Sequence, residues 1–325
     1  MQKVLIDLLQ SDPQISVIGT ARDGEETLSK IATLHPDVVT LDIEMPRMNG
    51  LTTVRKIMET NPLPVIMISA LTQREAQLTL KALEFGAVDY VPKPSGPISL
   101  NMNTVKNELI SKVKTAASAN IRPVKPPAME TIAPSTAKSS DRIISIAAST
   151  GGPAAVAYVL RNIPENTPPI LVVQHMQKGM TKLFSEGLNQ KCKIKVKEAE
   201  EGDVAQEGLA LIAPGGFHMV VTKNGKVNLT TSPRVNYVRP SADVMMKSAA
   251  KTYASKNIGI ILTGMGADGA KGIEAIKKKG GVTIAQDKKT CVVFGMPDAA
   301  IKTGCVDFVT PLEGIPKEIM NVCED

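Results

Sequence analysis

Three residues in the second half of the chain have the types that nucleophilic catalysis requires, namely Ser149, His175 and Asp268. A hydroxyl is a weak nucleophile until an imidazole takes its proton, and the imidazole needs a carboxylate that fixes its tautomer and stabilises its cation. Each residue follows a short apolar run that is typical of a buried strand. Because the carboxyl ends of parallel strands meet at one edge of a sheet, the pattern predicts a serine hydrolase site. The G-x-S-x-G motif of common esterases is absent.

The serine lies in a pattern of strand, turn and helix. Residues 143–148 are apolar or small, two glycines follow Thr150, and Pro153 suits a first helical turn because its missing N–H would be unpaired there. A serine at such a turn lies beside the N–H groups of a helix N-terminus, which stabilise developing negative charge. Serine, threonine and glycine also form plain loops, and a histidine such as His175 is often a core residue, so both structural alternatives remain open.

Residues 264–269 support a different hypothesis. They match G-x-G-x-x-G between an apolar run and a helical pattern, and Asp287 follows about 20 residues later, as in dinucleotide-binding sites. A nicotinamide oxidoreductase is therefore an alternative function, although Asp268 would repel a pyrophosphate and the roles of Ser149 and His175 would stay unexplained. A catalytically inactive binding module is the other alternative.

The first half of the chain offers a second set of chemical groups. Asp42, Ser69 and Lys93 each lie at the end of an apolar run. A carboxylate at a strand end is a nucleophile for phosphoryl transfer, and the transferred group needs a cation and a hydroxyl donor. The alternative is a polar, solvated rim of the sheet.

The elements that must position these residues alternate between strands and helices of about ten residues. This alternation predicts an α/β protein with two doubly wound parallel sheets. In the first half we expect strands at 15–21, 37–42, 64–70 and 89–94, and helices at 24–34, 50–60, 73–84 and 101–118. In the second half we expect strands at 143–148, 169–176, 193–199, 209–214, 258–263 and 282–287, helices at 153–161, 180–190, 241–254 and 270–279, and a hairpin around Asn224-Gly225. The segment 119–140 is rich in proline, lysine and serine, and predicts a linker.

Composition narrows the class of protein. The 325 residues are 43% hydrophobic and 22% charged, which is typical of a soluble globular protein. No apolar run reaches the ~18 residues of a membrane span, and the four cysteines form no C-x-x-C pair, so we expect a cytoplasmic protein without membrane insertion. With a net charge of +6, 3% aromatic residues and no tryptophan, nucleic-acid binding is disfavoured.

The motif at residues 41–50, together with Ser69, Tyr90 and Lys93-Pro94, resembles the receiver domain of bacterial response regulators. The resemblance implies that Asp42 accepts a phosphoryl group from a histidine kinase and that Lys93 pairs with the phosphate. It further implies that Ser69 hydrogen-bonds the phosphate and that Tyr90 moves in response. It also implies a flavodoxin-like fold for residues 1–118.

The chain departs from the receiver pattern at its start. Receivers begin with an inner strand that ends in a pair of acidic residues holding Mg²⁺, whereas this sequence begins at the helix that follows. We therefore expect a receiver that lacks its first strand and is N-terminally incomplete, with no assignable metal ligands beside Asp42. Mg²⁺ would serve phosphorylation only if the missing strand exists.

Taken together, the two halves resemble the chemotaxis protein-glutamate methylesterases. The likeness rests on the receiver, the linker and motifs at 148–153, 174–176, 213–216, 239–243 and 262–269. It implies that a Rossmann-like domain at 141–325 hydrolyses glutamate γ-methyl esters of chemoreceptors, and deamidates glutamines there, under control of receiver phosphorylation. By this resemblance Ser149, His175 and Asp268 are catalytic, the N–H of Met265 is an oxyanion donor, Thr150 supports the histidine, and ester hydrolysis needs no cofactor.

Overall fold

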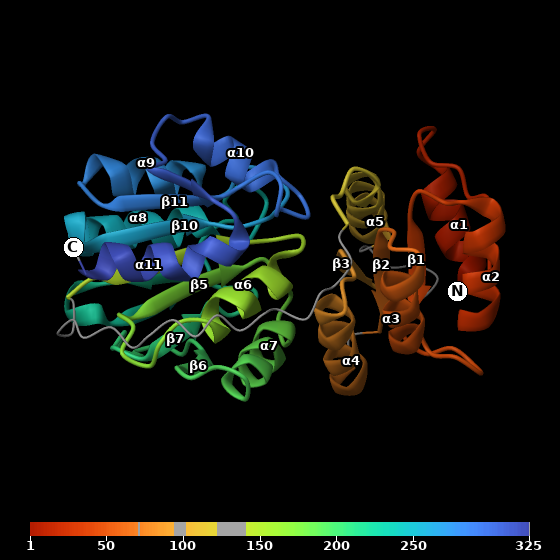
Figure 1. The fold of residues 1–325 in the computed structure, drawn as a ribbon, viewed down its shortest axis with the longest axis horizontal. Coiled ribbons are helices and arrows are strands. Elements are labelled where there is room, and N and C mark those ends of the chain that lie inside the picture. The colour runs from red at the N-terminus through yellow and green to blue at the C-terminus, as the bar shows by residue number, and fades with distance from the viewer. Residues whose placement is uncertain (71, 94–101, 122–140, 325) are drawn as a thin grey trace. The chain divides into compact units, whose positions relative to one another are not determined.

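The computed structural model describes residues 1–70, 72–93, 102–121 and 141–324 (Figure 1). The chain divides into two compact units, Met1–Pro126 and Pro127–Asp325. Most of the predicted linker 119–140, and Pro94, lie outside the described residues. None of the helices in the described ranges is long and apolar enough to cross a membrane.

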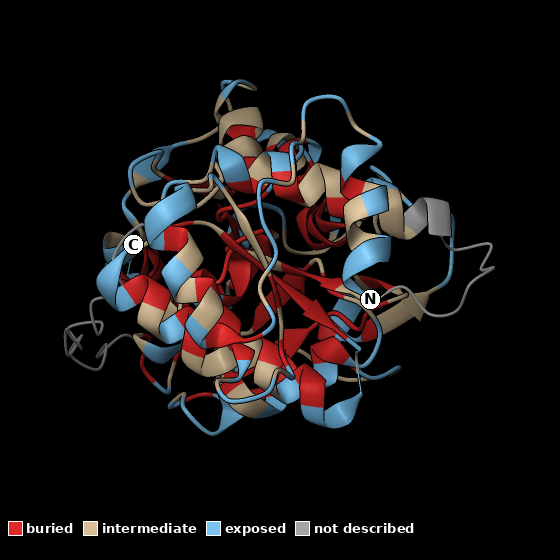
Figure 2. Ribbon diagram, turned by 90° about the vertical axis from the view of Figure 1, so that its right-hand side faces the viewer, coloured by how far each residue is buried: buried red, intermediate tan, exposed pale blue. Residues whose placement is uncertain are grey.

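The first unit is a small parallel sheet covered by helices. Its strands pair in the order β1-β2-β3, with β2 in the middle. The strands are β1 (Val39–Asp42), β2 (Val65–Ser69) and β3 (Asp89–Pro92), and the helices are α1 (Gln2–Gln10), α2 (Gly24–Leu34), α3 (Gly50–Thr60), α4 (Gln73–Glu84) and α5 (Met102–Ala117). Helices α1 and α5 contact each other, and α3 contacts both α2 and α4, so the two groups cover opposite faces. Strand β2 is buried throughout, β1 is mostly half-buried, and the helices expose their outer faces (Figure 2).

One predicted strand of this unit does not form. Residues 15–21 have no regular secondary structure, so the prediction of a strand there was wrong. The apolar and β-branched composition suits a strand, but strands are stabilised by pairing, and none of the three described strands of the unit lies beside this segment. The other predicted strands and helices of the unit are present.

The second unit contains a sheet of seven parallel strands in the order β12-β11-β10-β4-β5-β7-β6. The central strand β4 (Ile143–Ala148) is flanked by β5 (Ile170–Gln174) and β10 (Asn257–Ile261). The outer strands are β6 (Lys195–Glu198), β7 (Leu209–Ile212), β11 (Val282–Gln286) and β12 (Phe308–Thr310). The chain winds outward in both directions from β4, which confirms the doubly wound arrangement predicted from the sequence.

Helices cover both faces of this sheet. On one face, helix α9 (Ala270–Lys278) contacts both α8 (Ala242–Tyr253) and α10 (Gly295–Ile301). Helix α6 (Gly152–Arg161) contacts α7 (Met180–Asn189) and α11 (Ile315–Glu324) on the other. A separate antiparallel hairpin, β8 (His218–Val221) and β9 (Val227–Thr230), forms around Asn224 and Gly225 as predicted.

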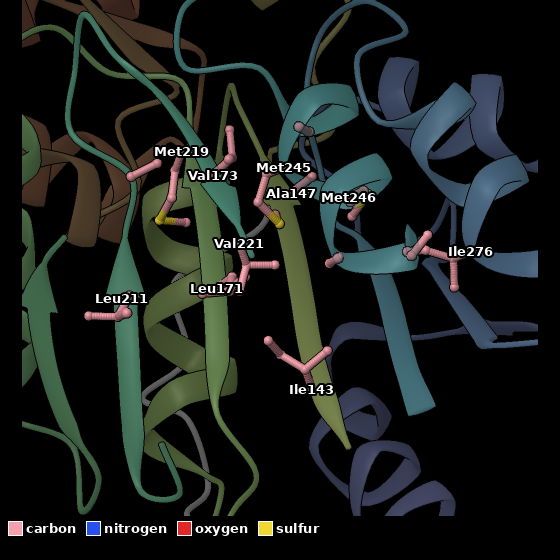
Figure 3. Packing of buried hydrophobic residues seen from close by; sticks show 14 of the residues in the cluster. Ile143, Ala147, Leu171, Val173, Leu211, Met219, Val221, Met245, Met246 and Ile276 are labelled. Atoms are coloured by element: carbon pink, nitrogen blue, oxygen red, sulfur yellow. The ribbon is translucent and has the colours of Figure 1, made fainter. Parts of the chain in front are cut away.

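The core of the second unit joins the central strands to helix α8. Leu171 and Val173 of β5 and Met245 and Met246 of α8 are completely buried in one cluster (Figure 3). Burying a side chain of this size contributes about 1.5–3 kcal/mol each. This packing fixes the strand ends, on which the candidate site depends.

Candidate active site

The candidate nucleophile, Ser149, is held at a tight turn between β4 and α6. Its N–H donates to the carbonyl of Thr263 at 3.0 Å, and its own carbonyl accepts from the N–H of Gly152 at 2.7 Å. Gly151 has φ +73°, and a Cβ there would lie 2.6 Å from Val292, so only glycine fits. The turn places Ser149 just ahead of α6, whose N-cap is Gly151 and whose first backbone N–H groups have no partner within the helix.

The two strands beside β4 bring the other candidate residues to the same edge. Ala148 is paired with Gln174, and the N–H of His175 donates to the carbonyl of Ala148 at 3.1 Å. On the other side of β4, β10 leads through Thr263 into the loop that carries Asp268. Ser149 therefore lies between the ends of the strands that carry the imidazole and the carboxylate.

The imidazole of His175 is bonded to Asp268. Its Nε2 lies 2.8 Å from Oδ2 of Asp268, and the two side chains are 12% and 3% exposed. Because the carboxylate is an acceptor, Nε2 carries the proton, and Nδ1 keeps the lone pair that can receive a second proton. Among the described residues no hydrogen bond joins the Ser149 hydroxyl to His175, and such bonds are often long or misaligned before substrate binds.

Asp268 is held by four further hydrogen bonds. Its Oδ1 accepts from Ser241 Oγ at 2.7 Å, from Asn236 Nδ2 at 3.0 Å and from the N–H of Asp243 at 3.2 Å. Its Oδ2 accepts from the N–H of Ala242 at 2.6 Å. Burial alone would raise the pKa of Asp268, but the bonds from His175, Ser241 and Ala242 lower it to about 2. The carboxylate is therefore ionised and fixed in orientation at neutral pH.

Thr150 and Met265, which the sequence predicts to support catalysis, both lie close to Ser149. Thr150 is buried, and its carbonyl accepts from Thr263 Oγ1 at 3.0 Å, which ties the serine turn to the end of β10. Met265 follows Gly264, whose missing Cβ would lie 2.8 Å from Cβ of Ser149. This close approach brings the backbone of the loop after β10 against the nucleophile.

Sequence reasoning missed the residues that hold Asp268. Ser241 belongs to the quoted motif at 239–243 but received no role, although its position before a helix is a recognisable signal. Asn236 has φ +51°, and its Nδ2 bonds both Asp268 and Asp243. No signal in the sequence connects that loop with the site.

In the first unit, the ends of the three strands also meet. Lys93 Nζ lies 2.8 Å from Oδ1 of Asp42 and 3.5 Å from Oε2 of Glu75. Burial alone would lower the pKa of Lys93, but these carboxylates raise it, so the lysine is charged. Glu75, which sequence reasoning missed, also accepts from the N–H of Ala70 at 2.6 Å.

The other two predicted residues of the first unit are more deeply placed. Ser69 is completely buried at the end of β2, and its Oγ accepts from Thr79 Oγ1 at 3.0 Å. Tyr90 of β3 is 3% exposed and pairs with Met67 of β2. Asp42 and Lys93 are in direct contact, and Ser69 ends the strand between them, where its carbonyl accepts from the N–H of Lys93 at 2.7 Å.

Comparison with known proteins shows the family. The model of the CheB methylesterase family matches residues 144–319, and that of the response regulator receiver domain matches residues 1–103. The chain belongs to the CheB methylesterase family. A protein-glutamate methylesterase/protein-glutamine glutaminase of Pyrococcus abyssi is 50% identical over 100% of this chain and 91% of its own length. One of Halalkalibacterium halodurans is 44% identical over 100% of this chain and 95% of its own length. The crystal structure of the Thermotoga maritima CheB methylesterase catalytic domain is 45% identical, with a TM-score of 0.54 over 56% of this chain and 98% of that one.

The CheB assignment replaces the dinucleotide hypothesis for residues 264–269. The N–H groups of Gly269 and Gly272, at the start of α9, both donate to Oδ1 of Asp243, at 3.0 and 2.8 Å. A pyrophosphate would need those same N–H groups. The carboxylate of Asp243 therefore occupies the position that a dinucleotide phosphate would take at the start of α9.

The receiver domain suggests Mg²⁺ binding during phosphorylation. Within the ranges that the structure describes, no three His, Cys, Asp or Glu side chains are placed to hold a metal. Mg²⁺ prefers an octahedron of carboxylate and water oxygens. Asp42 is instead paired with the ammonium group of Lys93.

Proposed function

We propose that the chain hydrolyses γ-methyl esters of glutamate, and deamidates glutamine, on the cytoplasmic part of methyl-accepting chemoreceptors. The observation that carries the proposal is the bond between His175 and Asp268 beside the Ser149 turn. Membership of the CheB family supports this substrate class, because relatives with 44–50% identity carry the name protein-glutamate methylesterase/protein-glutamine glutaminase. The chain would act in the cytoplasm.

In the proposed mechanism Ser149 Oγ attacks the ester carbonyl while its proton moves to Nδ1 of His175. The N–H of Met265 and the N-terminus of α6 stabilise the oxyanion, and each such donor contributes about 10²–10³ in rate. The intermediate collapses to an acyl-serine, and the proton on His175 leaves with methanol. Water then attacks the acyl-serine by the same route, which releases glutamate and restores Ser149. A glutamine side chain follows the same steps with ammonia as the leaving group.

Each remaining residue has a role in this proposal. Asp268 holds Nε2–H of His175 and stabilises the imidazolium cation. Thr150 supports the histidine through its place in the serine turn. The ester step uses protein groups alone, without a cofactor.

The receiver unit would control the esterase. In this proposal a chemotaxis histidine kinase transfers a phosphoryl group to Asp42, Lys93 neutralises the added charge, Ser69 hydrogen-bonds it and Tyr90 shifts. The contact between Asp42 and Lys93 supports the proposal, since the cation is already beside the acceptor. We propose domain bounds of 1–118 for the receiver, 119–140 for the linker and 141–325 for the esterase.

Methanol release from methylated chemoreceptor tests the esterase. We expect Ser149→Ala to abolish release, because the variant lacks the hydroxyl that attacks the ester carbonyl. Ser255→Ala, which alters an exposed serine of the same unit, serves as the control and should leave the rate unchanged. Equal release by the Ser149→Ala variant and the native chain would refute the mechanism.

Phosphorylation is tested separately with the kinase and radiolabelled ATP. The native chain should take up label and Asp42→Asn should not. Label on both chains would exclude Asp42 as the acceptor.

A further inference from the structure

The segment 233–241 of the esterase unit is a loop whose two ends are held by one imidazole. His218 of β8 is completely buried, and its Nε2 donates to the carbonyl of Pro233 at 3.1 Å. Its Nδ1 accepts from the N–H of Ser241 at 3.1 Å. A carbonyl can only accept and an N–H can only donate, so His218 is neutral with its proton on Nε2. The loop therefore starts and ends at fixed points.

The tip of this loop is a two-residue hairpin turn. The N–H of Val235 donates to the carbonyl of Val238 at 3.2 Å, and the N–H of Val238 donates to the carbonyl of Val235 at 3.0 Å. Asn236 and Tyr237 between them have φ +51° and +65°. Positive φ at both central residues defines a type I′ turn, which favours Asn-Gly because glycine has no Cβ to clash. Tyrosine is an unfavourable residue for the second position.

The ring of Tyr237 does not stabilise the fold in exchange. The residue is 93% exposed, so its ring buries almost no apolar surface within the chain. The turn is held through the backbone instead, where Nη1 of Arg234 donates to the carbonyl of Tyr237 at 3.3 Å. A bulky residue in an unfavourable backbone conformation, with its side chain in solvent, indicates a role in function.

The turn is connected directly to the catalytic residues. Nδ2 of Asn236 donates to Oδ1 of Asp268 at 3.0 Å, and Oδ2 of the same carboxylate bonds Nε2 of His175 at 2.8 Å. Tyr237 is the next residue after Asn236. Its ring is therefore presented to solvent beside the imidazole that takes the proton of the nucleophile.

A second exposed apolar side chain lies beside the nucleophile itself. Met265 is 43% exposed, and it follows Gly264, whose missing Cβ would lie 2.8 Å from Cβ of Ser149. Tyr237 and Met265 thus come from two different loops that both reach the catalytic residues. Tyrosine and methionine are enriched in protein interfaces, and a tyrosine ring provides a large contact area at low cost in conformational entropy.

We propose that Tyr237 determines substrate specificity, because its ring packs against an apolar side chain of the receptor segment that carries the methylated glutamate. Met265 provides a second contact to the same segment. This role rests on the proposed esterase function. A pocket that recognises one methyl group discriminates by only about 10–200-fold, so selection of a protein substrate needs contacts with the residues around the ester.

Kinetics of the full chain with methylated chemoreceptor test this role. Tyr237→Gly removes the ring and creates the Asn-Gly pair that the turn favours, so Tm should not fall. KM should rise by ~10-fold or more, as for a central interface residue, while kcat stays within ~3-fold. Tyr237→Phe keeps the ring and should keep KM within ~2-fold of the native chain. The control is Phe308→Ala, which removes another exposed ring of the unit, on the outermost strand β12, and should leave KM unchanged.

Three results would overturn the role of the ring. They are an unchanged KM in Tyr237→Gly, an equal rise of KM in Tyr237→Phe, and a rise of KM that is accompanied by a lower Tm. The last result would show that the ring supports the fold.

Binding without turnover separates this role from the esterase function. In the Ser149→Ala chain, addition of Tyr237→Gly should raise Kd for methylated chemoreceptor by ~10-fold or more, and addition of Phe308→Ala should not. If the native chain releases no methanol, the esterase function fails. If methanol is released but Kd is the same with and without the ring, only the role of Tyr237 fails.

Discussion

The strongest test of the esterase site is the substitution Asp268→Asn. The carboxylate accepts two bonds on Oδ2 and three on Oδ1, so the amide group of asparagine must face at least two donors. The less crowded position is that of Oδ2, opposite His175. There the amide donates to Nε2, and the imidazole proton moves to Nδ1. His175 then has no lone pair for the proton of Ser149.

Asp268→Asn is expected to change both the free energy of unfolding and kcat. The pKa of Asp268 falls from 3.8 to about 2, so its surroundings favour the ionised form by about 2 kcal/mol, at 1.36 kcal/mol per pKa unit. Asp268→Asn removes this favourable contribution, which lowers the free energy of unfolding without abolishing the fold. The wrong tautomer has the larger effect on chemistry, and in a well-studied serine protease it lowers kcat by about 10⁴-fold. We expect a similar loss of kcat here, with a small change in KM.

Methanol release gives the rate, thermal unfolding gives the stability, and ¹⁵N NMR of the histidine ring gives the tautomer. The matched control is Asn236→Ala, which removes one neutral donor to Oδ1 and leaves the His175 bond intact. It should lower kcat by about 10-fold or less, since one neutral hydrogen bond contributes about 1 kcal/mol. The reasoning fails if Asp268→Asn keeps kcat within 10-fold of the native chain, or if its His175 still carries the proton on Nε2.

Three other outcomes follow from the same contacts. Ser241→Ala should raise the pKa of Asp268 and reduce the free energy of unfolding by about 1–3 kcal/mol, measured by NMR titration and urea denaturation. Gly264→Ala places a Cβ 2.4 Å from Met296 Sδ and 2.8 Å from Cβ of Ser149, so methanol release should fall at least ~10-fold while circular dichroism shows an unchanged fold. Because the pKa of Asp268 is lowered on folding, its contribution to the free energy of unfolding is fully present above about pH 4. Acid titration should show that this free energy falls by about 2 kcal/mol between pH 4 and pH 2. The Asp268→Asn variant should not show this fall.

Much of the esterase fold could be predicted because its strands are buried on both faces. A strand such as β4 is a continuous apolar run, and the residue after it stands out as polar or as glycine. Ser149 and His175 were found in this way, at the ends of neighbouring strands. Their roles stay predictions until the activity of the variants is measured.

The residues that hold Asp268 in place could not be predicted, because their positions depend on the paths of loops. Asn236 reaches Asp268 only through a backbone with φ +51°, which no spacing rule specifies. Asp243 lies in the first turn of α8, yet its carboxylate accepts from N–H groups at the N-terminus of a different helix, α9. The segment 15–21 shows the opposite error, since its composition suits a strand but it pairs with none of the described strands.

The central position of β4 also determines when the enzyme can appear during synthesis. One edge of β4 pairs with β5, which follows after about 25 residues. The other edge of β4 can pair only when β10 has been synthesised. The hydrogen bond between Ser145 and Asn257 spans 112 positions of sequence. A ribosome adding about 5–20 residues per second leaves that edge uncovered for several seconds. A nascent chain that stops before residue 257 has Ser149 and His175 but neither Asp268 nor a closed sheet, so it is inactive and prone to pair with other strands. Termination as late as residue 256 is therefore harmful even though the nucleophile has long been synthesised.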